Sequence, residues 1–390
     1  MAAYPIIDAD SHVEECEETW AHLEPRYAAR RPVIVQAPLG PGVCHQDAFW
    51  LVDGRVHPQP FGHGATMLGT PVTSALARKK PFTIGSQTLR DIPQRLVEMD
   101  AFGIAAAVLY PTALLVRLTE DPSFEAALMR SYNTWLAERC AQAPDRLKWA
   151  AALPFRAPGE AVEEVQRARQ LGASAAMVLG TAGATLLHDE QFDPIYRELV
   201  RQDLPLSVHV GWGHPGLQES ADGMFASFSL SFSLPVLAGF FSIVGGGVLD
   251  RHPDLRVAFL EAGGDWLPWM VQRMDRYRGV TQFHNVEPVS RHPIPEYLRQ
   301  GNVYLTVEGD EWLLPQVIEV LGEDHVMASA DIPHPEGRED CLAGVATRQD
   351  LSAAVKEKIL SRNPARFYGI ALETLASLTP TQRASAAAGR

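Results

Sequence analysis

The sequence predicts an α/β protein folded as a (β/α)8 barrel of the TIM type. Short apolar runs recur along the 390 residues, and a stretch with helical periodicity follows most of them. Most of these runs are continuously apolar, which is typical of strands buried on both faces of a parallel sheet. Eight such repeats favour a closed barrel, and a doubly wound open sheet is the alternative.

The repeats can be assigned in order along the chain. The predicted strands are residues 4–9, 105–110, 149–154, 175–180, 205–211, 256–260, 303–307 and 326–330. The predicted helices are residues 91–102, 122–143, 158–171, 193–202, 264–278, 311–321 and 349–361. The third of these helices has the clearest limits, because it begins with Pro158 and is followed by Gly172.

One long break in this rhythm sets the domain organisation. Residues 14–90 separate the first strand from its helix, and they are too numerous and too rich in Pro, Gly and His for an ordinary connection. We expect residues 1–370 to form a single barrel domain, with this insertion over the mouth, where such loops shape the substrate pocket. Residues 371–390 end in a run of mostly Ala, Thr and Ser and are expected to form a disordered tail.

Composition excludes several classes of protein. Apolar residues make up 46% of the chain and charged residues 21%, which is ordinary for a soluble globular protein. The formal net charge of −13 repels phosphate backbones, so we expect no nucleic-acid partner. Four widely spaced cysteines, and an N-terminus without the pattern of a signal peptide, indicate reduced thiols in a cytoplasmic protein. These cysteines are Cys16, Cys44, Cys140 and Cys341.

An uncharged segment at residues 224–249 is long enough to cross a bilayer. It contains a proline, several glycines and five serines, and charged residues follow it at once. We therefore expect no membrane partner. A helix buried against the core and against a second subunit fits the segment better, which predicts a homodimer.

The end of the first strand carries the first candidate for chemistry, the sequence Asp8-Ala-Asp10-Ser-His12. Side chains alternate along a strand, so Asp8, Asp10 and His12 point the same way. Asp10 and His12 could share a divalent metal ion. The alternative is a capped turn beside a hydrogen-bonded histidine.

Two further strands end in candidates of the same kind. His209 ends the fifth strand, and the alternative for it is a core histidine. His214 follows in a glycine-containing loop, where simple exposure is the alternative. Asp331 closes the eighth strand and could bind a metal, transfer a proton or cap a turn. In a closed barrel these strand ends converge on one mouth, which favours a shared metal site.

Several motifs together resemble the amidohydrolase-2 group of the amidohydrolase superfamily, which includes aminocarboxymuconate-semialdehyde decarboxylase and the resorcylate decarboxylases. The motifs are IDADSH at 7–12 with Glu15, VEMDAFGIAAAVLYP at 97–111, PDLRV at 253–257, EAGGDWLPWMVQRMD at 261–275, SADIPH at 329–334 and NPARFYG at 363–369. The resemblance implies a metal-dependent barrel of the metal-dependent hydrolase type. By position, its metal ligands fall on Asp10, His12, His209 and Asp331, and its acid/base on Asp331.

The sequence departs from that pattern at two places. The first ligand is Asp10, where the semialdehyde decarboxylase has His and resorcylate decarboxylases have Glu. Two carboxylates and two imidazoles form a hard donor set, so the single ion could be Zn²⁺ or Mn²⁺, with Mg²⁺ possible. Ala262 stands where the group's decarboxylases carry a histidine. The neighbouring Glu261 could replace that histidine or cap the turn at Gly263 and Gly264.

Two reactions fit these residues. In the first, a protonated Asp331 delivers a proton to an aromatic or unsaturated carboxylic acid, which then loses CO₂ without oxidation. In the second, the metal activates a water for hydrolysis of a C–N, C–O or activated C–C bond, Asp331 takes its proton, and Glu261 or His214 protonates the leaving group. Decarboxylation is slightly favoured, because much of the characterised group decarboxylates. A barrel that has lost its activity is a third reading.

The expected partner is a small-molecule substrate. We assign its binding to Trp212 and His334 beside the metal ligands, and to Arg55 and His63 in the insertion. The insertion also offers His57, Arg78 and several aromatic residues. For each of these residues the alternative is an ordinary role in a loop.

Overall fold

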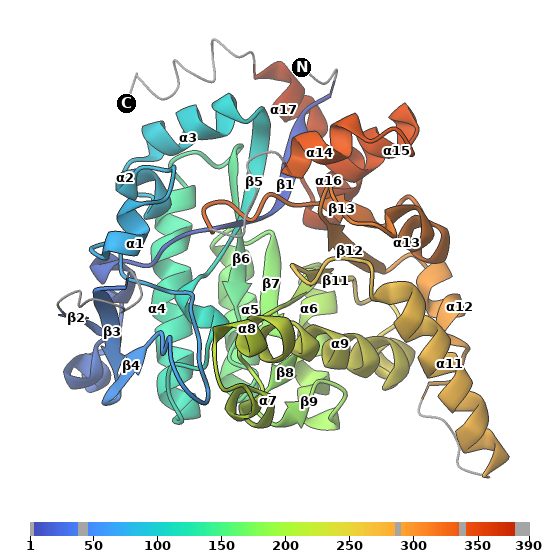
Figure 1. The fold of residues 1–390 in the computed structure, drawn as a ribbon, viewed down its shortest axis with the longest axis horizontal. Coiled ribbons are helices and arrows are strands. Elements are labelled where there is room, and N and C mark those ends of the chain that lie inside the picture. Colours follow the sequence, from blue (N-terminus) through green and yellow to red (C-terminus); the bar gives the residue numbers. More distant parts are fainter. Residues whose placement is uncertain (1–3, 38–45, 285–289, 335–340, 379–390) are drawn as a thin grey trace.

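The computed structural model describes residues 4–37, 46–284, 290–334 and 341–378. Within these residues, eight parallel strands form one sheet whose spatial order is the order of the chain (Figure 1). The strands are β1 (Ile6–His12), β5 (Ile104–Tyr110), β6 (Leu147–Ala152), β7 (Ala175–Leu179), β10 (Leu206–His209), β11 (Val257–Leu260), β12 (Val303–Val307) and β13 (Val326–Ala328). The predicted strand–helix alternation is confirmed.

Backbone hydrogen bonds join the first strand to the last and close the barrel. The His12 N–H donates to the Ile332 carbonyl oxygen over 2.7 Å, and the Asp331 N–H donates to the Asp10 carbonyl oxygen over 3.0 Å. The Asp8 side chain adds a third bond by accepting the Ala330 N–H over 2.9 Å. This seam confirms the barrel over the open sheet, and it brings the ends of β1 and β13 together.

The seven predicted helices are present, although the fifth extends to Phe283. Residues 294–299, 341–347 and 363–368 form further helices that were not predicted. The helices around the barrel are α3 (Ile92–Ala101), α4 (Pro122–Cys140), α5 (Pro158–Gln170), α6 (Asp193–Arg201), α11 (Leu267–Phe283), α12 (Ile294–Arg299), α13 (Leu314–Leu321), α14 (Cys341–Thr347), α15 (Ala353–Glu357), η7 (Lys358–Arg362) and α16 (Asn363–Tyr368). Their starts follow local chemistry. Asp121, for example, accepts the Ser123 N–H over 3.0 Å at the start of α4, and Pro122 takes the first helical position.

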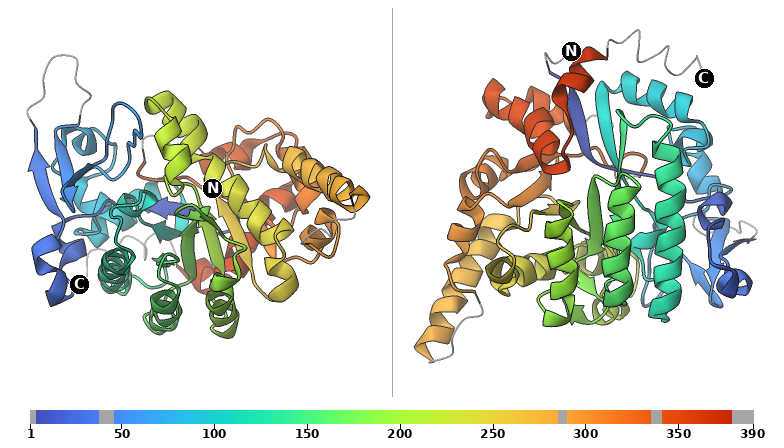
Figure 2. Two further views of the ribbon diagram at one scale, coloured as in Figure 1. Left: turned by 90° about the horizontal axis from the view of Figure 1, so that it is seen from below. Right: turned by 180° about the vertical axis from the view of Figure 1, so that it is seen from behind.

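The insertion after β1 contains a small sheet of its own. The strands β2 (Val33–Gln36), β3 (Ala48–Val52) and β4 (Arg55–His57) pair antiparallel, and Asp53 and Gly54 connect the last two with φ of 48° and 76°. This sheet lies at the edge of the molecule in both figures, to one side of the barrel (Figures 1 and 2). The prediction of an insertion over the mouth is therefore incomplete, because its first half forms this sheet beside the barrel.

The uncharged segment after β10 forms a chain of short helices. They are α8 (Met224–Ala226), η5 (Ser227–Phe232), α9 (Leu234–Phe240), η6 (Phe241–Gly245) and α10 (Val248–Arg251). Residues 224–251 are long and apolar enough to cross a membrane by length and composition, but 72% of the most apolar window is buried inside the protein. Helix α9 packs against β7, β10 and β11, as the buried part of the prediction requires.

The chain end and the cysteines show further details. A helix, α17 (Leu372–Ser377), occupies the start of the segment predicted to be a disordered tail, and it is held by the buried side chain of Leu375. Residues 379–390 lie outside the described part. Cys16 and Cys140 are buried free thiols. Cys44 and the Cys341 side chain are not described.

Close packing of α9 on β7 yields a test of the fold. A Cβ at Gly180 would overlap the Pro235 carbonyl group, so Gly180→Ala should lower the free energy of unfolding by about 1–3 kcal/mol. Urea denaturation followed by circular dichroism measures this change. In the matched control Gly159→Ala, a Cβ meets nothing within 4 Å, and stability should stay the same or rise slightly. Equal midpoints for the two variants would contradict the close approach.

Candidate active site

Three buried side chains from two strands meet at the barrel's mouth. Asp10 and His12 come from the end of β1 and His209 from the end of β10, and all three are fully buried. His209 Nε2 lies 3.3 Å from Asp10 Oδ1, and His12 Nε2 lies 3.4 Å from the same oxygen. The structure thus brings together three of the four residues assigned as metal ligands from the sequence.

Both imidazole rings present Nε2 to this cluster. Nδ1 of His12 lies 2.9 Å from the Pro111 carbonyl oxygen, and Nδ1 of His209 lies 3.0 Å from that of Val210. Because a carbonyl oxygen only accepts, each ring donates through Nδ1–H. The Nε2 atoms are then left for a metal, which is the usual arrangement of ligating histidines.

Glu261 joins the cluster from the end of β11. Its Oε2 lies 3.2 Å from His209 Nε2 and 3.4 Å from His12 Nε2. The ligand atoms of Asp10, His12, His209 and Glu261 all lie within 4.8 Å of one another. The turn that Glu261 was expected to cap has another partner, since the Gly264 N–H donates to Glu311 Oε2 over 2.7 Å. Glu261 therefore faces the metal donors.

Asp331 approaches the same nitrogen of His12, with its Oδ1 3.3 Å from Nε2. It falls in a second group of close donors, together with His12, Glu261 and His334. His334 Nδ1 lies 2.8 Å from Asp331 Oδ1, and its Nε2 lies 2.9 Å from Thr112 Oγ1. Since Thr112 donates its own proton to the Val13 carbonyl oxygen, its oxygen accepts from His334 Nε2–H. His334 thus lies between Thr112 and Asp331 and contacts both.

Two of these carboxylates stand on strained backbone. Glu261 has a φ of 62° and Asp331 a φ of 54°, a left-handed conformation that costs a residue with a Cβ roughly 1–2 kcal/mol. Glu261 directly follows the last residue of β11, and Asp331 lies three residues after the end of β13. In each case the chain turns so that the carboxylate points toward His12. The strained backbone is therefore explained by the geometry that the site requires.

The charges of the cluster shift the pKa values of its members. Burial alone would lower the pKa of His12, but its close contacts with the Asp10 and Glu261 carboxylates raise it well above the usual range. Burial would likewise raise the pKa of Asp10, yet the nearby rings of His209 and His12 lower it to about 2. Asp10 and a protonated His12 thus form a charged pair in the metal-free protein.

The buried atoms of the cluster fit one divalent metal ion. His12 Nε2, Asp10 Oδ2 and both carboxylate oxygens of Glu261 are buried without a hydrogen-bond partner. Leaving such atoms unpartnered is costly, and a cation shared by carboxylates and imidazoles removes the cost. Two imidazoles and two or three carboxylates form a set that divalent metals bind.

The structure places two predicted residues close to the site but in other contacts. His214 is the N-cap of α7 (Pro215–Ser220), where its Nδ1 accepts the Leu217 N–H over 3.2 Å. Trp212 is buried, and its Nε1–H donates to Ser227 Oγ over 2.6 Å. These contacts give both residues a structural role, and their roles in catalysis and substrate binding stay predictions.

The two predicted substrate residues of the insertion lie on the surface. The Arg55 side chain is 56% exposed and pairs with Glu120 over 2.9 Å, and His63 is exposed. Neither belongs to the donor groups around His12.

Sequence reasoning missed a buried ion pair next to the donors. The Lys80 ammonium pairs with Glu14, and these side chains are 9% and 2% exposed. Burial lowers the pKa of His334 well below its usual range, and the charges of His12 and Lys80 lower it further, so Lys80 lies within electrostatic reach of the cluster. The signal was present, since Glu14 stands two residues after His12, and Lys80 ends the longest basic run.

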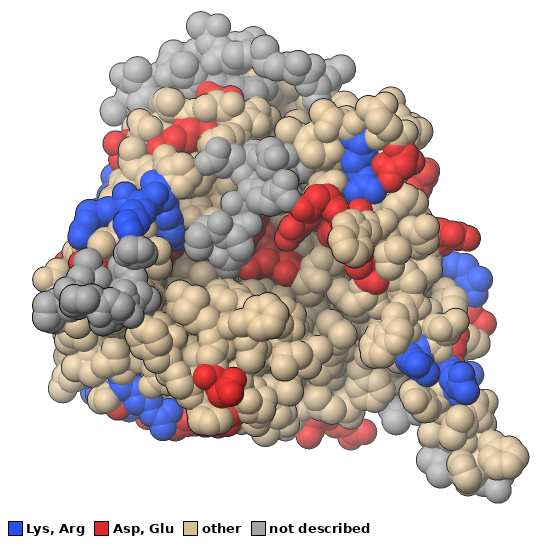
Figure 3. All heavy atoms as spheres, viewed as in Figure 1, with Lys and Arg blue, Asp and Glu red and all other residues tan. Residues whose placement is uncertain are grey.

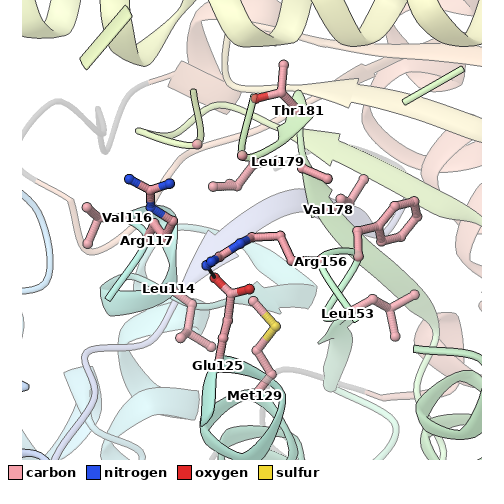
Figure 4. A pocket seen from close by; sticks show the side chains of 14 residues that line it. Leu114, Val116, Arg117, Glu125, Met129, Leu153, Arg156, Val178, Leu179 and Thr181 are labelled. Carbon is pink, nitrogen blue, oxygen red and sulfur yellow. Dashed lines mark hydrogen bonds and ion pairs between the residues drawn. The ribbon is translucent and has the colours of Figure 1, made fainter. Parts of the chain in front are cut away.

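A cavity of about 40 Å³ lies at the ends of β6 and β7, apart from the donor groups (Figure 4). Arg156 points at Glu125 there, and its Nη1 donates to Glu125 Oε1 over 3.1 Å. Arg156 also donates to the carbonyl oxygens of Thr119 and Glu120. Because these contacts tie α4 to the loop after β6, the charges of this cavity serve the fold.

A parallel barrel with buried carboxylates and imidazoles at the carboxyl ends of its strands defines the class of metal-dependent (β/α)8 enzymes. The family model for amidohydrolases matches residues 7–370. The chain therefore belongs to the amidohydrolase family, and it is a metal-dependent enzyme of that superfamily.

Several proteins similar to this chain are decarboxylases. The gamma-resorcylate decarboxylase of Rhizobium sp. (strain MTP-10005) is 30% identical over 251 residues, which are 61% of this chain and 76% of that protein. A crystal structure of 2,6-dihydroxybenzoate decarboxylase with 2,6-dihydroxybenzoate matches at 26% identity and a TM-score of 0.62, covering 70% of this chain and 87% of that one. A manganese-containing 5-carboxyvanillate decarboxylase from Novosphingobium aromaticivorans shares the fold at 22% identity and a TM-score of 0.68, covering 94% and 96%.

Metal binding should release protons at neutral pH. The raised pKa of His12 means that its Nε2 carries a proton in the metal-free protein, and an ion must displace that proton. Affinity for Mn²⁺ should therefore rise with pH through neutrality. Calorimetric titration in two buffers of different ionisation enthalpy counts the protons released.

Variants of single histidines test where the metal binds. His12→Ala and His209→Ala should each lower the bound metal, whereas His22→Ala, which removes an exposed histidine paired with Glu138, should not. Metal content that is the same in all three purified variants would contradict the assigned site.

Proposed function

We propose that the protein is a metal-dependent, non-oxidative decarboxylase of an aromatic or unsaturated carboxylic acid. The observation that carries the proposal is the place of Asp331. It stands beside the compact donor group of Asp10, His12, His209 and Glu261, so it can act on a substrate held there. The similarity to gamma-resorcylate decarboxylase supports the same reaction class.

The donor group would hold one divalent ion that orients the substrate carboxylate and offsets its charge. Asp331, in its protonated form, delivers its proton to the ring carbon that bears the carboxylate. The bond from this carbon to the carboxylate then breaks, its electron pair restores the aromatic ring, and CO₂ leaves. Asp331 recovers a proton from water.

His334 and Thr112 keep Asp331 in place for this transfer. The chain of contacts from Thr112 Oγ1 through His334 to Asp331 Oδ1 is buried, so the carboxyl group has little freedom to turn. His334 also stacks on His12 with ring centroids 4.0 Å apart. We assign His334 a positioning role, which replaces direct substrate binding.

Manganese is the ion we propose. Glu261 adds a carboxylate to the set expected from the sequence, and carboxylate-rich sets favour Mn²⁺ or Mg²⁺ over Zn²⁺, while imidazoles disfavour Mg²⁺. The manganese in the carboxyvanillate decarboxylase belongs to that protein and agrees with this choice.

We also propose a homodimer. Phe225 is 87% exposed, and Leu230, Leu234 and Phe241 along the same helical segment are 36–48% exposed. Figure 3 shows that the face over α8 and α9 carries few charged side chains. An apolar surface of this kind is typical of a subunit interface.

The reaction can be tested directly. Metal-loaded enzyme incubated with 2,6-dihydroxybenzoate and related hydroxybenzoates should release CO₂, and in D₂O the product should carry one deuterium at the former carboxyl position. Hydrolysis of an added amide or ester panel, with no CO₂ from any acid, would refute decarboxylation and favour the hydrolase alternative.

Replacement of the acid should stop the reaction without loss of the fold. Asp331→Asn should lower turnover by about 10²–10⁴-fold, the usual share of a general acid. Steady-state CO₂ release measures it, with Asp254→Asn, an exposed acid, as the control. Turnover of Asp331→Asn within twofold of wild type would exclude the assigned proton donor.

A further inference from the structure

A nearly apolar cavity of about 180 Å³ lies between the insertion and the segment after β10. Met67, Leu68 and Leu76 of the insertion form one side, and Met224 and Phe228 form the other. An apolar cavity of about 150 Å³ is enough to bind benzene, so this volume suits one aromatic ring.

Glu14 and Lys80 are the charged groups in the cavity lining. Their ion pair uses one carboxylate oxygen, Glu14 Oε1. The other oxygen, Glu14 Oε2, is buried and has no hydrogen-bond partner. Lys80 has three N–H donors, and the contact with Glu14 uses one. The pair therefore offers an acceptor and a donor side by side.

Both sides of the cavity are tied to the metal-ligand strands. Glu14 follows His12 by two residues, and the His12 ring is part of the donor cluster. On the opposite side, Phe228 contacts Trp212, three residues after His209, with ring centroids 5.5 Å apart. Short stretches of chain therefore join the cavity lining to the donor cluster, and Lys80 of the lining lies within electrostatic reach of His334.

We propose that this cavity holds the ring of the substrate acid and that Glu14 and Lys80 recognise a hydroxyl group on it. The hydroxyl donates to Glu14 Oε2 and accepts from Lys80 Nζ. It stands at a ring position not adjacent to the carboxyl-bearing carbon, because an adjacent hydroxyl would lie with the carboxylate at the donor cluster. The inference rests on the proposed decarboxylase function and adds the substrate class, a phenolic acid with a hydroxyl at its far side.

The Glu14–Lys80 pair also disfavours substituents other than a hydroxyl at this position of the substrate ring. A second carboxylate would meet the negative charge of Glu14, and an apolar substituent would leave Glu14 Oε2 unpartnered. A hydroxyl is both donor and acceptor, so it satisfies the pair. Sites of this kind reject the analogue that lacks the hydroxyl, because buried polar groups then stay unpaired.

Binding measurements on the full-length, Mn²⁺-loaded enzyme test the inference. The probes are 2-hydroxybenzoate and its 2,3-, 2,4- and 2,5-dihydroxy relatives, titrated by calorimetry. At least one dihydroxy acid should bind about tenfold or more tighter than 2-hydroxybenzoate. Wild-type affinities within threefold for all four acids would overturn the inference.

The variants Glu14→Gln and Lys80→Met should abolish this preference. Because breaking a buried pair can unfold a protein, the double variant Glu14→Gln/Lys80→Met, which removes both charges, is measured as well. Lys79→Met, at the exposed neighbour, is the control and should keep the preference. A preference that survives in the folded double variant would also overturn the inference.

The CO₂ assay separates this inference from the proposed reaction. A hydroxyl preference that depends on Glu14 and Lys80 supports the cavity's role even when no acid loses CO₂, and the proposed function then fails alone. Release of CO₂ without any such preference retains the proposed function and refutes the inference.

Discussion

The seam between the first and the last strand is the constraint on which the site depends. Two backbone hydrogen bonds join Asp10 to Asp331 and His12 to Ile332. They fix the ends of β1 and β13 side by side, although more than three hundred positions separate them in the chain. A carboxylate from the last strand and an imidazole from the first can then stand 3.3 Å apart. An open sheet with the same elements would leave these groups on opposite edges.

The seam concentrates charge that the fold by itself cannot balance. Asp10, Glu261 and Asp331 all approach His12, and two of the three stand on left-handed backbone. Buried carboxylates without a cation are unfavourable, so such an arrangement persists where another purpose supports it. A protonated His12 offsets part of this charge in the metal-free protein, and a divalent ion can take over that task. The site is therefore built for exchange between protons and metal.

The sequence predicts the barrel well, because its strands are buried on both faces and their apolar runs stand out. It also predicts that Asp10, His12 and His209 lie close together, because the carboxyl ends of the strands converge at the mouth of a barrel. Glu261 was left open, since one residue of backbone shift decides where its side chain points, and a positive φ cannot be read from a pattern. The hairpin at Asp53 and Gly54 was missed although an Asp-Gly pair between apolar runs is a strong signal. Among the basic residues of the insertion, the sequence analysis selected Arg55, which is exposed, and did not select Lys80, which is buried. The sequence alone does not show which of these side chains is buried.

The contrast between Arg55 and Lys80 shows how the barrel and its insertion divide the work. Arg55 lies in the peripheral sheet and pairs with Glu120 at the surface, where solvent weakens the pair. Lys80 lies in the insertion's second half, which returns to the barrel before α3, and it meets Glu14 at the end of β1. In the proposed function the barrel supplies the metal ligands and the acid, and these alone do not choose a substrate. The returning half of the insertion adds a wall and a buried charge pair to the same mouth. Selectivity can therefore change through this segment while the metal ligands stay fixed.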